Sequence, residues 1–580
     1  MDQKPLSIWK RPWRGPAQLL AWFGLFAIAT FVVFFCIGLL AARDTSVAET
    51  ALSAFLASLV LSVLAGVGLL CIRLLCNWRN LRRLLFVVAC LITLVALAYA
   101  EENWRGKHAW QKYRRQWEAK GEKFDLAALV PPAVPDEKNF ALAPLLKPLM
   151  DFTRETSGVV WRDTNGLARI EGISANISPH RDRNNDLVYG SVEKGTFADL
   201  KACAEFYRGN TNYPQAASSA TAAETILAAL GRFDLEIKEL REAAASRPLS
   251  RFPIHYDEEP PWGILLRHLA RIKGLTILTY VRATAELEAG HPAEAFEDLK
   301  LGLRFSDSIT NEPFLIDQLV RIASLGIDLQ TVREGLVRHA WTGPQLAEME
   351  TYLSSLNLLA EYKFAMRGER ALGTANLDYI RRQGFRADPM DYMDDEGRAR
   401  NAGSSLKAIP GGWYYQNMLG LCRLHEQFTL PAVDEQTHRV FPQVSENFDS
   451  TISKMRRGPY TIFAVLLFPA LEPAAAKSAR MQAYVDSARV ACALERYRLA
   501  NSKLPDTLDA LGPPFITTVP NDIIDGKLLR YRPGSNGGYV LYSIGWNQTD
   551  DGGEIAWVKG KKDSTVDATS GDWVWKMTAE

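Results

Sequence analysis

Three apolar segments crowd the first hundred residues of this 580-residue chain, and they constrain its fold more than any other feature. They cover residues 17–42, 51–72 and 84–100, and none of them contains a charged side chain. A helix of about 20 apolar residues crosses the hydrocarbon core of a bilayer, with about 17 to 25 tolerated. Backbone amides in hydrocarbon must also bond within their own segment, which favours a helix. The sequence therefore predicts an N-terminal membrane anchor of three transmembrane helices within residues 1–100.

The apolar segments have two alternative interpretations. One is a buried hairpin of a soluble protein, which three such segments in tandem disfavour. The other is a cleaved signal peptide for the first segment. That segment exceeds the usual apolar core of about 7–15 residues, and no small-residue cleavage site precedes the second segment.

Basic residues near the segment ends predict the orientation of the anchor. Four of them precede the first segment, only Arg43 lies in the first loop, and four lie in the second loop. Because Lys and Arg accumulate in cytoplasmic loops, the large C-terminal region is expected outside the cytoplasm. The basic stretch 105–115 would favour the opposite orientation, but long domains translocate largely regardless of charge.

Overall charge and cysteine content exclude several function classes. Lys and Arg number 67 against 66 Asp and Glu, so nothing in the balance predicts nucleic acid as a partner. Of the seven cysteines, only Cys203, Cys422 and Cys492 lie beyond the apolar segments, and they are far apart. This pattern is neither a disulfide framework nor a zinc site.

The remaining chain divides by pattern into four regions of a mainly α-helical protein. Residues 101–135 predict a juxtamembrane helix followed by a Pro-rich linker, and 136–215 are irregular and mixed. Residues 216–460 repeat apolar side chains at helical spacing and predict an α-helical domain. Residues 461–580 predict a long helix followed by a small antiparallel sheet.

One stretch of the helical region predicts an antiparallel helix pair. Ala285 to Leu299 reads Ala-x-Leu-Glu-Ala-Gly-x-Pro-x-Glu-Ala-Phe-x-Asp-Leu, with Gly290 at the turn and Ala295 at a small packing position. It resembles the middle of a tetratricopeptide hairpin. Because no 34-residue period accompanies it, the resemblance implies packed helical hairpins rather than a repeat protein.

The C-terminal region carries a second resemblance. A helix near residue 494 precedes a Pro-containing element at 504–511, two strands at 527–532 and 538–543, and the acidic, Gly-rich loop 547–553. This order resembles the soluble part of the major pseudopilins of type II secretion. The chain lacks their Gly-Phe-Thr-x-x-x-Glu start, so the resemblance implies a small α+β terminal module rather than a fibre subunit.

In those pseudopilins the acidic loop holds calcium. The resemblance places Asp550, Asp551 and Glu554 as the oxygen donors in this chain. Calcium takes six to eight oxygens, so three carboxylates would need backbone carbonyls or water as well. The alternative is a solvated Asp-Asp-Gly-Gly turn.

The whole arrangement resembles a group of uncharacterised bacterial membrane-anchored proteins. The shared segments are Arg251-Phe-Pro-x-His-Tyr256, Arg367-Gly-Glu-Arg-Ala371 and Leu541-Tyr-Ser-Ile-Gly-Trp-Asn547. The resemblance implies a multi-pass protein of the bacterial inner membrane, and it implies no activity.

Two clusters could carry chemistry. Asp182 to Glu193 matches EF-hand loop positions 1, 3, 5 and 12, but position 6 is Leu187 instead of the glycine that the turn requires. His255 lies beside Asp257 and Glu258, which could form an acid–base set or a metal site, although a capped loop explains them equally. No nucleophile elbow, phosphate loop or dinucleotide fingerprint is present.

We therefore assign no catalytic, cofactor-binding or metal residue from the sequence. The expected function is a non-enzymatic scaffold or binding protein of the bacterial cell envelope, with the lipid bilayer and envelope proteins as partners. Two alternatives stay open: a membrane-bound hydrolase built on His255, Asp257 and Glu258, and a component of a secretion system.

Overall fold

The structure is a computed structural model, and contacts divide the chain into two compact units, Met1–Glu101 and Glu102–Glu580. It describes residues 24–34, 36, 54–65, 67–68, 78–155, 158–175, 177–179, 188–384, 409–455, 457–471, 473–534, 538–558 and 566–577. Most of these residues are helical and the strands are short, which confirms the expectation of a mainly α protein.

In the first unit, one described helix is long and apolar enough to cross a membrane. It is the 41-residue α3 (Trp78–Glu118), which contains the third apolar segment. The first two segments appear as the shorter apolar helices Gly24–Phe34 and Ala54–Ala65, and their remaining residues lie outside the described part. A single helix of this kind meets the length and hydropathy criteria for a span, and the three-span anchor stays a prediction.

The second unit is built from paired helices, of which α8 (Arg267–Ala289) and α9 (Pro292–Asp307) form the expected hairpin. Gly290 ends α8 with a φ of 83°, a left-handed conformation that glycine adopts without steric cost. Ala295 is fully buried, as its small packing position predicts. The other helices of this unit are α4 (Thr164–Ser174), α5 (Leu200–Tyr207), α6 (Ala222–Leu230), α7 (Asp234–Ser246), α10 (Leu315–Val337), α11 (Gly343–Ser354), α12 (Leu358–Gln383), α13 (Gly411–Leu424), α14 (Pro442–Lys454), α15 (Ile462–Leu467) and α16 (Pro473–Asn501).

Residues 136–215, expected to be irregular, contribute to a hydrophobic core. They form a hairpin of β1 (Phe152–Glu155) and β2 (Gly158–Trp161), followed by α4 and α5. Phe140, Ile170 and Tyr207 are almost fully buried against α6, α8 and α9. This region therefore belongs to the same compact unit as the helical region that follows it.

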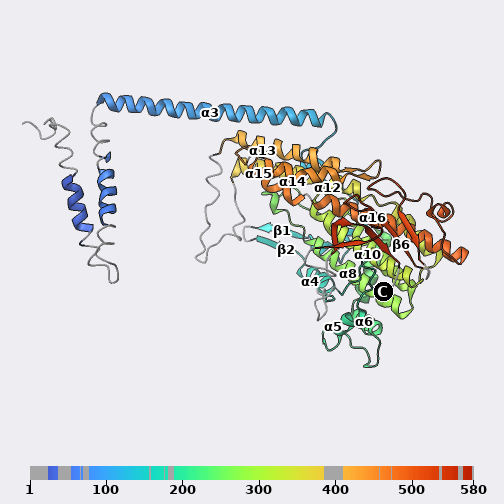
Figure 1. Cartoon of the computed structure of the whole chain (residues 1–580). Coiled ribbons are helices and arrows are strands. Elements are labelled where there is room, and N and C mark those ends of the chain that lie inside the picture. Colours follow the sequence, from blue (N-terminus) through green and yellow to red (C-terminus); the bar gives the residue numbers. More distant parts are fainter. Residues whose placement is uncertain are drawn as a thin grey trace, which may run out of the picture. The chain divides into compact units, whose positions relative to one another are not determined.

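The C-terminal residues form a small sheet packed on α16. β5 (Arg530–Pro533), β6 (Tyr539–Ser543) and β9 (Trp573–Lys576) are antiparallel in the order β5-β6-β9. α16 lies beside β6 and β9, as Figure 1 shows for α16 and β6. The sequence predicted β5 and β6 but missed β9, which lies far along the chain from its partner. Two smaller antiparallel pairs are β3 (Val433–Asp434) with β4 (Arg439–Val440) and β7 (Ile555–Trp557) with β8 (Val566–Gly571).

One hydrophobic core joins this sheet to the helices. Trp573 and Trp575 of β9 share it with buried side chains of α9, α10, α11 and α16. Arg333 of α10 adds a polar link, since its Nε donates to the Lys576 carbonyl at 2.8 Å and its Nη2 to the Gly195 carbonyl at 2.6 Å. The C-terminal module is thus part of the second unit rather than a separate body.

Candidate functional site

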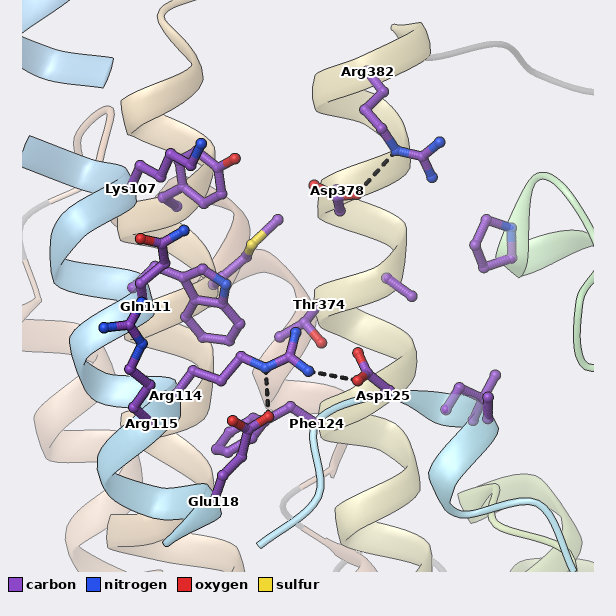
Figure 2. A pocket seen from close by; sticks show the side chains of 17 residues that line it. Lys107, Gln111, Arg114, Arg115, Glu118, Phe124, Asp125, Thr374, Asp378 and Arg382 are labelled. Carbon is purple, nitrogen blue, oxygen red and sulfur yellow. Dashed lines mark hydrogen bonds and ion pairs between the residues drawn. The ribbon is translucent and has the colours of Figure 1, made fainter. Parts of the chain in front are cut away.

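A cavity of about 800 Å³ lies between the C-terminal part of α3, α12 and α13 (Figure 2). The segment 124–127 closes one side of it, and Pro261 lies at its edge. A second, smaller cavity of about 250 Å³ lies between α9 and α11. The larger cavity has the volume of a typical small-molecule site, which is about 300–1,000 Å³.

One face of α3 supplies the polar wall of this cavity. Lys107, Gln111, Arg114, Arg115 and Glu118 recur at helical spacing, so they project from the same side of the helix. Figure 2 shows them along α3 opposite Thr374, Asp378 and Arg382 of α12. The stretch that the sequence predicted as a juxtamembrane helix therefore builds one wall of the cavity.

The acidic side chains of the cavity are already paired with arginines. Arg114 donates from Nε to Glu118 at 2.6 Å and from Nη2 to Asp125. Asp378 accepts from Nε of Arg382 at 2.9 Å and from Nε of Arg381 at 3.0 Å. Figure 2 shows Arg114 extending from α3 toward Asp125.

Two cations of the cavity differ from Arg114 and Arg382 because they have no acidic partner among the described residues. Lys107 and Arg115 are exposed, and neither forms an ion pair with any residue that the structure describes. Four cations and three carboxylates line the cavity, and each carboxylate has an arginine partner. The lining therefore carries a net charge of +1, which favours an anion as the ligand.

The base of the cavity is apolar and aromatic. Trp110 and Phe124 are buried and meet edge to face with ring centroids 5.9 Å apart. Met418 of α13 is 2% exposed beside them. The guanidinium of Arg370 lies 4.5 Å from the centroid of the Phe124 ring, on which it stacks. A lining of apolar and aromatic side chains with a few polar or charged groups is typical of small-molecule binding sites.

Arg370 holds the segment before Phe124 in place. Its Nη2 donates to the Glu122 carboxylate and, at 3.0 Å, to the Lys123 carbonyl, and Arg367 donates to the same carboxylate. Two arginine partners lower the pKa of Glu122, although partial burial opposes them. Among the described residues, Nε and Nη1 of the fully buried Arg370 have no hydrogen-bond partner.

A contact between two glycines sets the distance between α3 and α13. A Cβ on Gly106 would lie 2.5 Å from the Gly412 carbonyl oxygen, and a Cβ on Gly412 would lie 2.0 Å from the Glu102 carbonyl oxygen. Asn103 Oδ1 accepts from the Gly412 N–H at 2.9 Å and thereby caps the first turn of α13. These contacts fix the wall of the cavity that α3 provides.

The residues predicted for a hydrolase do not meet in this cavity. His255 is exposed and lies against the Phe152 ring, with centroids 5.1 Å apart. Glu258 pairs with Arg154 at 2.7 Å, and Asp257 is exposed. None of the three lines either of the two cavities.

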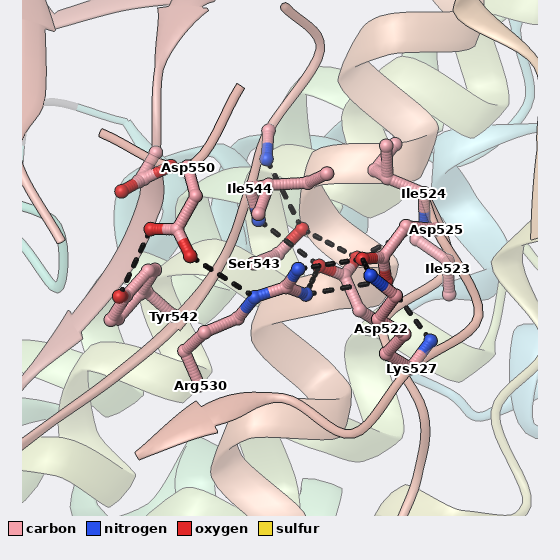
Figure 3. A network of polar contacts seen from close by, with 12 residues as sticks. Asp522, Ile523, Ile524, Asp525, Lys527, Arg530, Tyr542, Ser543, Ile544 and Asp550 are labelled. Atoms are coloured by element: carbon pink, nitrogen blue, oxygen red, sulfur yellow. Dashed lines mark hydrogen bonds and ion pairs between the residues drawn. The ribbon is translucent and has the colours of Figure 1, made fainter. Parts of the chain in front are cut away.

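Two of the three residues predicted for calcium, Asp550 and Asp551, are held by other groups. Asp550 accepts from the Tyr542 hydroxyl at 3.1 Å and lies 3.6 Å from Nε of Arg530, while Asp551 accepts from Asn547 at 2.8 Å. Figure 3 shows Arg530 between Asp550 and the pair Asp522 and Asp525. No group of three His, Cys, Asp or Glu side chains in the described part could hold a metal ion. A guanidinium thus supplies the positive charge beside Asp550.

The first half of the EF-hand-like segment, residues 182–187, lies outside the described residues. Its last position, Glu193, is described and pairs with Arg480 of α16 at 3.2 Å. That carboxylate therefore contributes to packing between the segment and α16.

A buried titratable cluster is the group that the sequence missed. His268 Nε2 lies 2.8 Å from Glu312 Oε2, and both side chains are buried together with Asp317. Burial lowers the pKa of His268 to about 4 and raises those of Glu312 and Asp317 well above their ordinary values. His268 and Glu312 are 44 residues apart, so no local sequence motif contains both of them.

Two of the short segments quoted for the bacterial resemblance converge on this cluster. Phe252 stacks on His268 with centroids 4.3 Å apart, and Glu369 accepts from the Leu315 N–H at 2.8 Å. A Cβ on Gly368 would lie 1.5 Å from the Pro313 carbonyl oxygen, so the two backbones touch there. His268 lines neither of the two cavities, and the cluster joins α8, α10 and α12.

No protein-family model, curated protein or solved structure matches this chain. The cavity and its geometry are consequently the basis of the functional argument.

Proposed function

We propose that this protein is a membrane-anchored, non-enzymatic binding protein of the bacterial cell envelope. In this proposal three helices anchor it, and the unit 102–580 lies on the extracytoplasmic side. The observation that supports it most directly is α3. This helix carries an apolar stretch long enough to cross a membrane and then, without a break, the face that lines the cavity.

The rigid attachment of α3 to the second unit supports the anchoring role. Gly106 and Gly412 allow backbone contact between α3 and α13, and Glu122 pairs with Arg367 and Arg370 just beyond the helix end. A flexible tether would need none of these contacts.

The distribution of perturbed titratable groups favours binding over catalysis. Catalytic acids and bases are groups with shifted pKa values in an accessible cleft. Here the strongest shifts belong to buried groups such as Glu312 and Asp328, neither of which lines a described cavity. The groups that line the larger cavity are arginines, a lysine and paired carboxylates instead.

The pseudopilin-like assignment of the C-terminal module belongs to the same proposal. The long helix α16 packs against the antiparallel sheet β5-β6-β9, which is the arrangement that the resemblance implies. We propose that this module supports the helical unit by sharing its core, because Trp573 and Trp575 are buried against the helices.

Topology is the experiment that tests the proposal. A phosphatase that is active only in the periplasm and a fluorescent protein that matures only in the cytoplasm are fused, separately, after Glu580. We expect phosphatase activity in the membrane fraction. We also expect the fusion protein to stay in that fraction after alkaline extraction. Fluorescence with no phosphatase activity would contradict the extracytoplasmic side, and recovery of the chain in the alkaline supernatant would contradict the anchor.

A further inference from the structure

We propose that the cavity between α3, α12 and α13 binds an anionic amphiphile, that is, a phosphate group carried on an apolar body. The proposed binding of the phosphate group depends only on residues of the second unit. A membrane lipid as the source of the ligand rests on the proposed membrane attachment. The phosphate chemistry is shared with soluble organic phosphates, and the experiment below separates the two sources.

The first argument is charge. Lys107 and Arg115 line the cavity, are exposed, and have no acidic partner in the part of the chain that the structure describes. The carboxylates of the cavity do not cancel this charge, because four cations and three carboxylates line it and leave a net charge of +1. Two unpaired cations on one cavity wall therefore attract an anion, and Arg and Lys are the usual partners of phosphate oxygens.

The second argument is the apolar floor. Tyr415, Pro261 and Ala375 are half-buried apolar side chains of the cavity, and Ala127 is exposed. A bare inorganic anion would leave this surface in contact with water. A ligand with both a charged head and an apolar body would cover it, at about 25 cal/mol for each Å² removed from water.

The third argument is the place of the cavity along α3. The third apolar segment ends at Ala100, and Lys107 follows seven residues later in the same helix. At about 1.5 Å per residue this is about 10 Å of helix, slightly more than the about 5–8 Å that each headgroup layer occupies. Long basic side chains at such positions extend toward phosphate groups. A membrane lipid is therefore the nearest source of an anionic amphiphile.

The test uses the full-length protein in neutral detergent micelles. Binding of three probes is measured by the shift of the thermal unfolding midpoint and by equilibrium titration: dioctanoyl phosphatidylglycerol, hexyl phosphate and inorganic phosphate. We expect saturable binding of the first two and much weaker binding of inorganic phosphate. Tighter binding of the lipid points to the membrane as the source, and equal binding of hexyl phosphate points to a soluble phosphate ester.

Two variants and a matched control test whether the ligand binds in this cavity. The double substitution Lys107→Gln and Arg115→Gln is expected to weaken lipid binding at least tenfold. Ala375→Phe, which keeps the charge but occupies space in the cavity, is expected to weaken it as well. The control is Lys112→Gln with Lys201→Gln, which removes two exposed cations that do not line the cavity and leaves binding unchanged.

Three results would overturn the inference. They are no saturable binding of either organic phosphate, inorganic phosphate binding as tightly as the lipid, and equal losses in the double variant and its control. None of these results depends on topology, because binding is measured in micelles. A failed topology experiment with intact binding would therefore contradict the proposed function alone.

Discussion

At the scale of single residues, the buried carboxyl of Asp522 is met by several partners at once. Asp522 accepts from the Ser543 hydroxyl at 2.7 Å, from the Ile524 and Ile544 N–H groups at 3.0 Å, and from Arg530 at 2.9 Å (Figure 3). Burial raises the pKa of this carboxyl, and the hydrogen bonds oppose that effect. Such full satisfaction offsets the cost of removing a carboxylate from water.

His425 is a second buried residue, and burial favours its neutral form. It is fully buried, its Nδ1 lies 2.9 Å from the Thr429 hydroxyl, and burial lowers its pKa to about 3. An unfolded chain protonates a histidine near pH 6.5. Between pH 6.5 and about 3 the unfolded state therefore binds a proton that the folded state does not, and stability falls as the pH falls.

We predict that His425→Gln reduces this loss of stability at acidic pH. Each pKa unit corresponds to about 1.4 kcal/mol, so the full effect of His425 is of the order of 4–5 kcal/mol. The measurement is the unfolding midpoint of both proteins at pH 7.5, 6.0 and 5.0. The control is Lys201→Gln at an exposed position, which leaves every histidine in place and should retain the wild-type pH dependence. Identical pH slopes for wild type and His425→Gln would refute the assignment.

At the scale of elements, the crossing of α3 and α13 depends on the absence of two side chains. Gly106 and Gly412 bring the backbones into contact, and Trp110 and Tyr113 then pack one turn later against Tyr414 and Met418. Small residues at a helix crossing permit this approach because no Cβ separates the backbones. The geometry of the cavity therefore depends on positions that carry no chemistry of their own.

We predict that Gly106→Ala destabilises the docking of α3 and that Gly420→Ala does not. A Cβ on Gly106 meets the Gly412 backbone at 2.5 Å, whereas a Cβ on Gly420 meets Ala464 at an ordinary 3.6 Å. The first change should cost about 1–3 kcal/mol through overpacking. The second should be neutral or stabilise by up to about 1 kcal/mol through helix propensity.

Amide hydrogen exchange of residues 102–118 measures this effect directly. Faster exchange is expected in Gly106→Ala and unchanged or slower exchange in Gly420→Ala. Equal exchange in the two variants would mean that the glycine contact does not control the docking of α3.

At the scale of the whole molecule, the unit 102–580 has a core that continues from the helices into the C-terminal sheet. Trp575 of β9 has no exposed surface, and it shares this core with Leu336 of α10 and Val490 of α16. Elements with a common core lose their contacts together when one of them unfolds. The C-terminal module should accordingly unfold with the helices.

We predict that Trp575→Ala lowers the stability of the entire second unit. Removing a buried large aromatic side chain costs about 3–5 kcal/mol, and the shared core should transmit that cost to every element. Unfolding of the full-length chain in detergent is followed by tryptophan fluorescence and by helical circular dichroism, which should shift together. Trp557→Ala, at a half-buried position, serves as the control and should shift both probes less. Two separate transitions would show that the sheet is an independent domain.

Local patterns in the sequence determined much of the architecture of this protein. Apolar spacing located α16 and the α8–α9 hairpin, and turn residues located the β5–β6 pair. The length of the third uncharged segment located the apolar part of α3. Each of these signals lies within about 30 neighbouring residues, because helix periodicity, turns and membrane length are properties of short segments.

Only the tertiary structure decided which distant residues meet. It placed β9 beside β6, His268 beside Glu312, and Lys107 across a cavity from Arg382. It also placed Arg530 beside Asp550. His255 and Glu258 have separate contacts, with Phe152 and Arg154, and do not share a site with Asp257. These outcomes depend on how helices pack, and packing is set by the shapes of many side chains at once. No single stretch of sequence carries that information, so the cavity emerges only when α3, α12 and α13 come together.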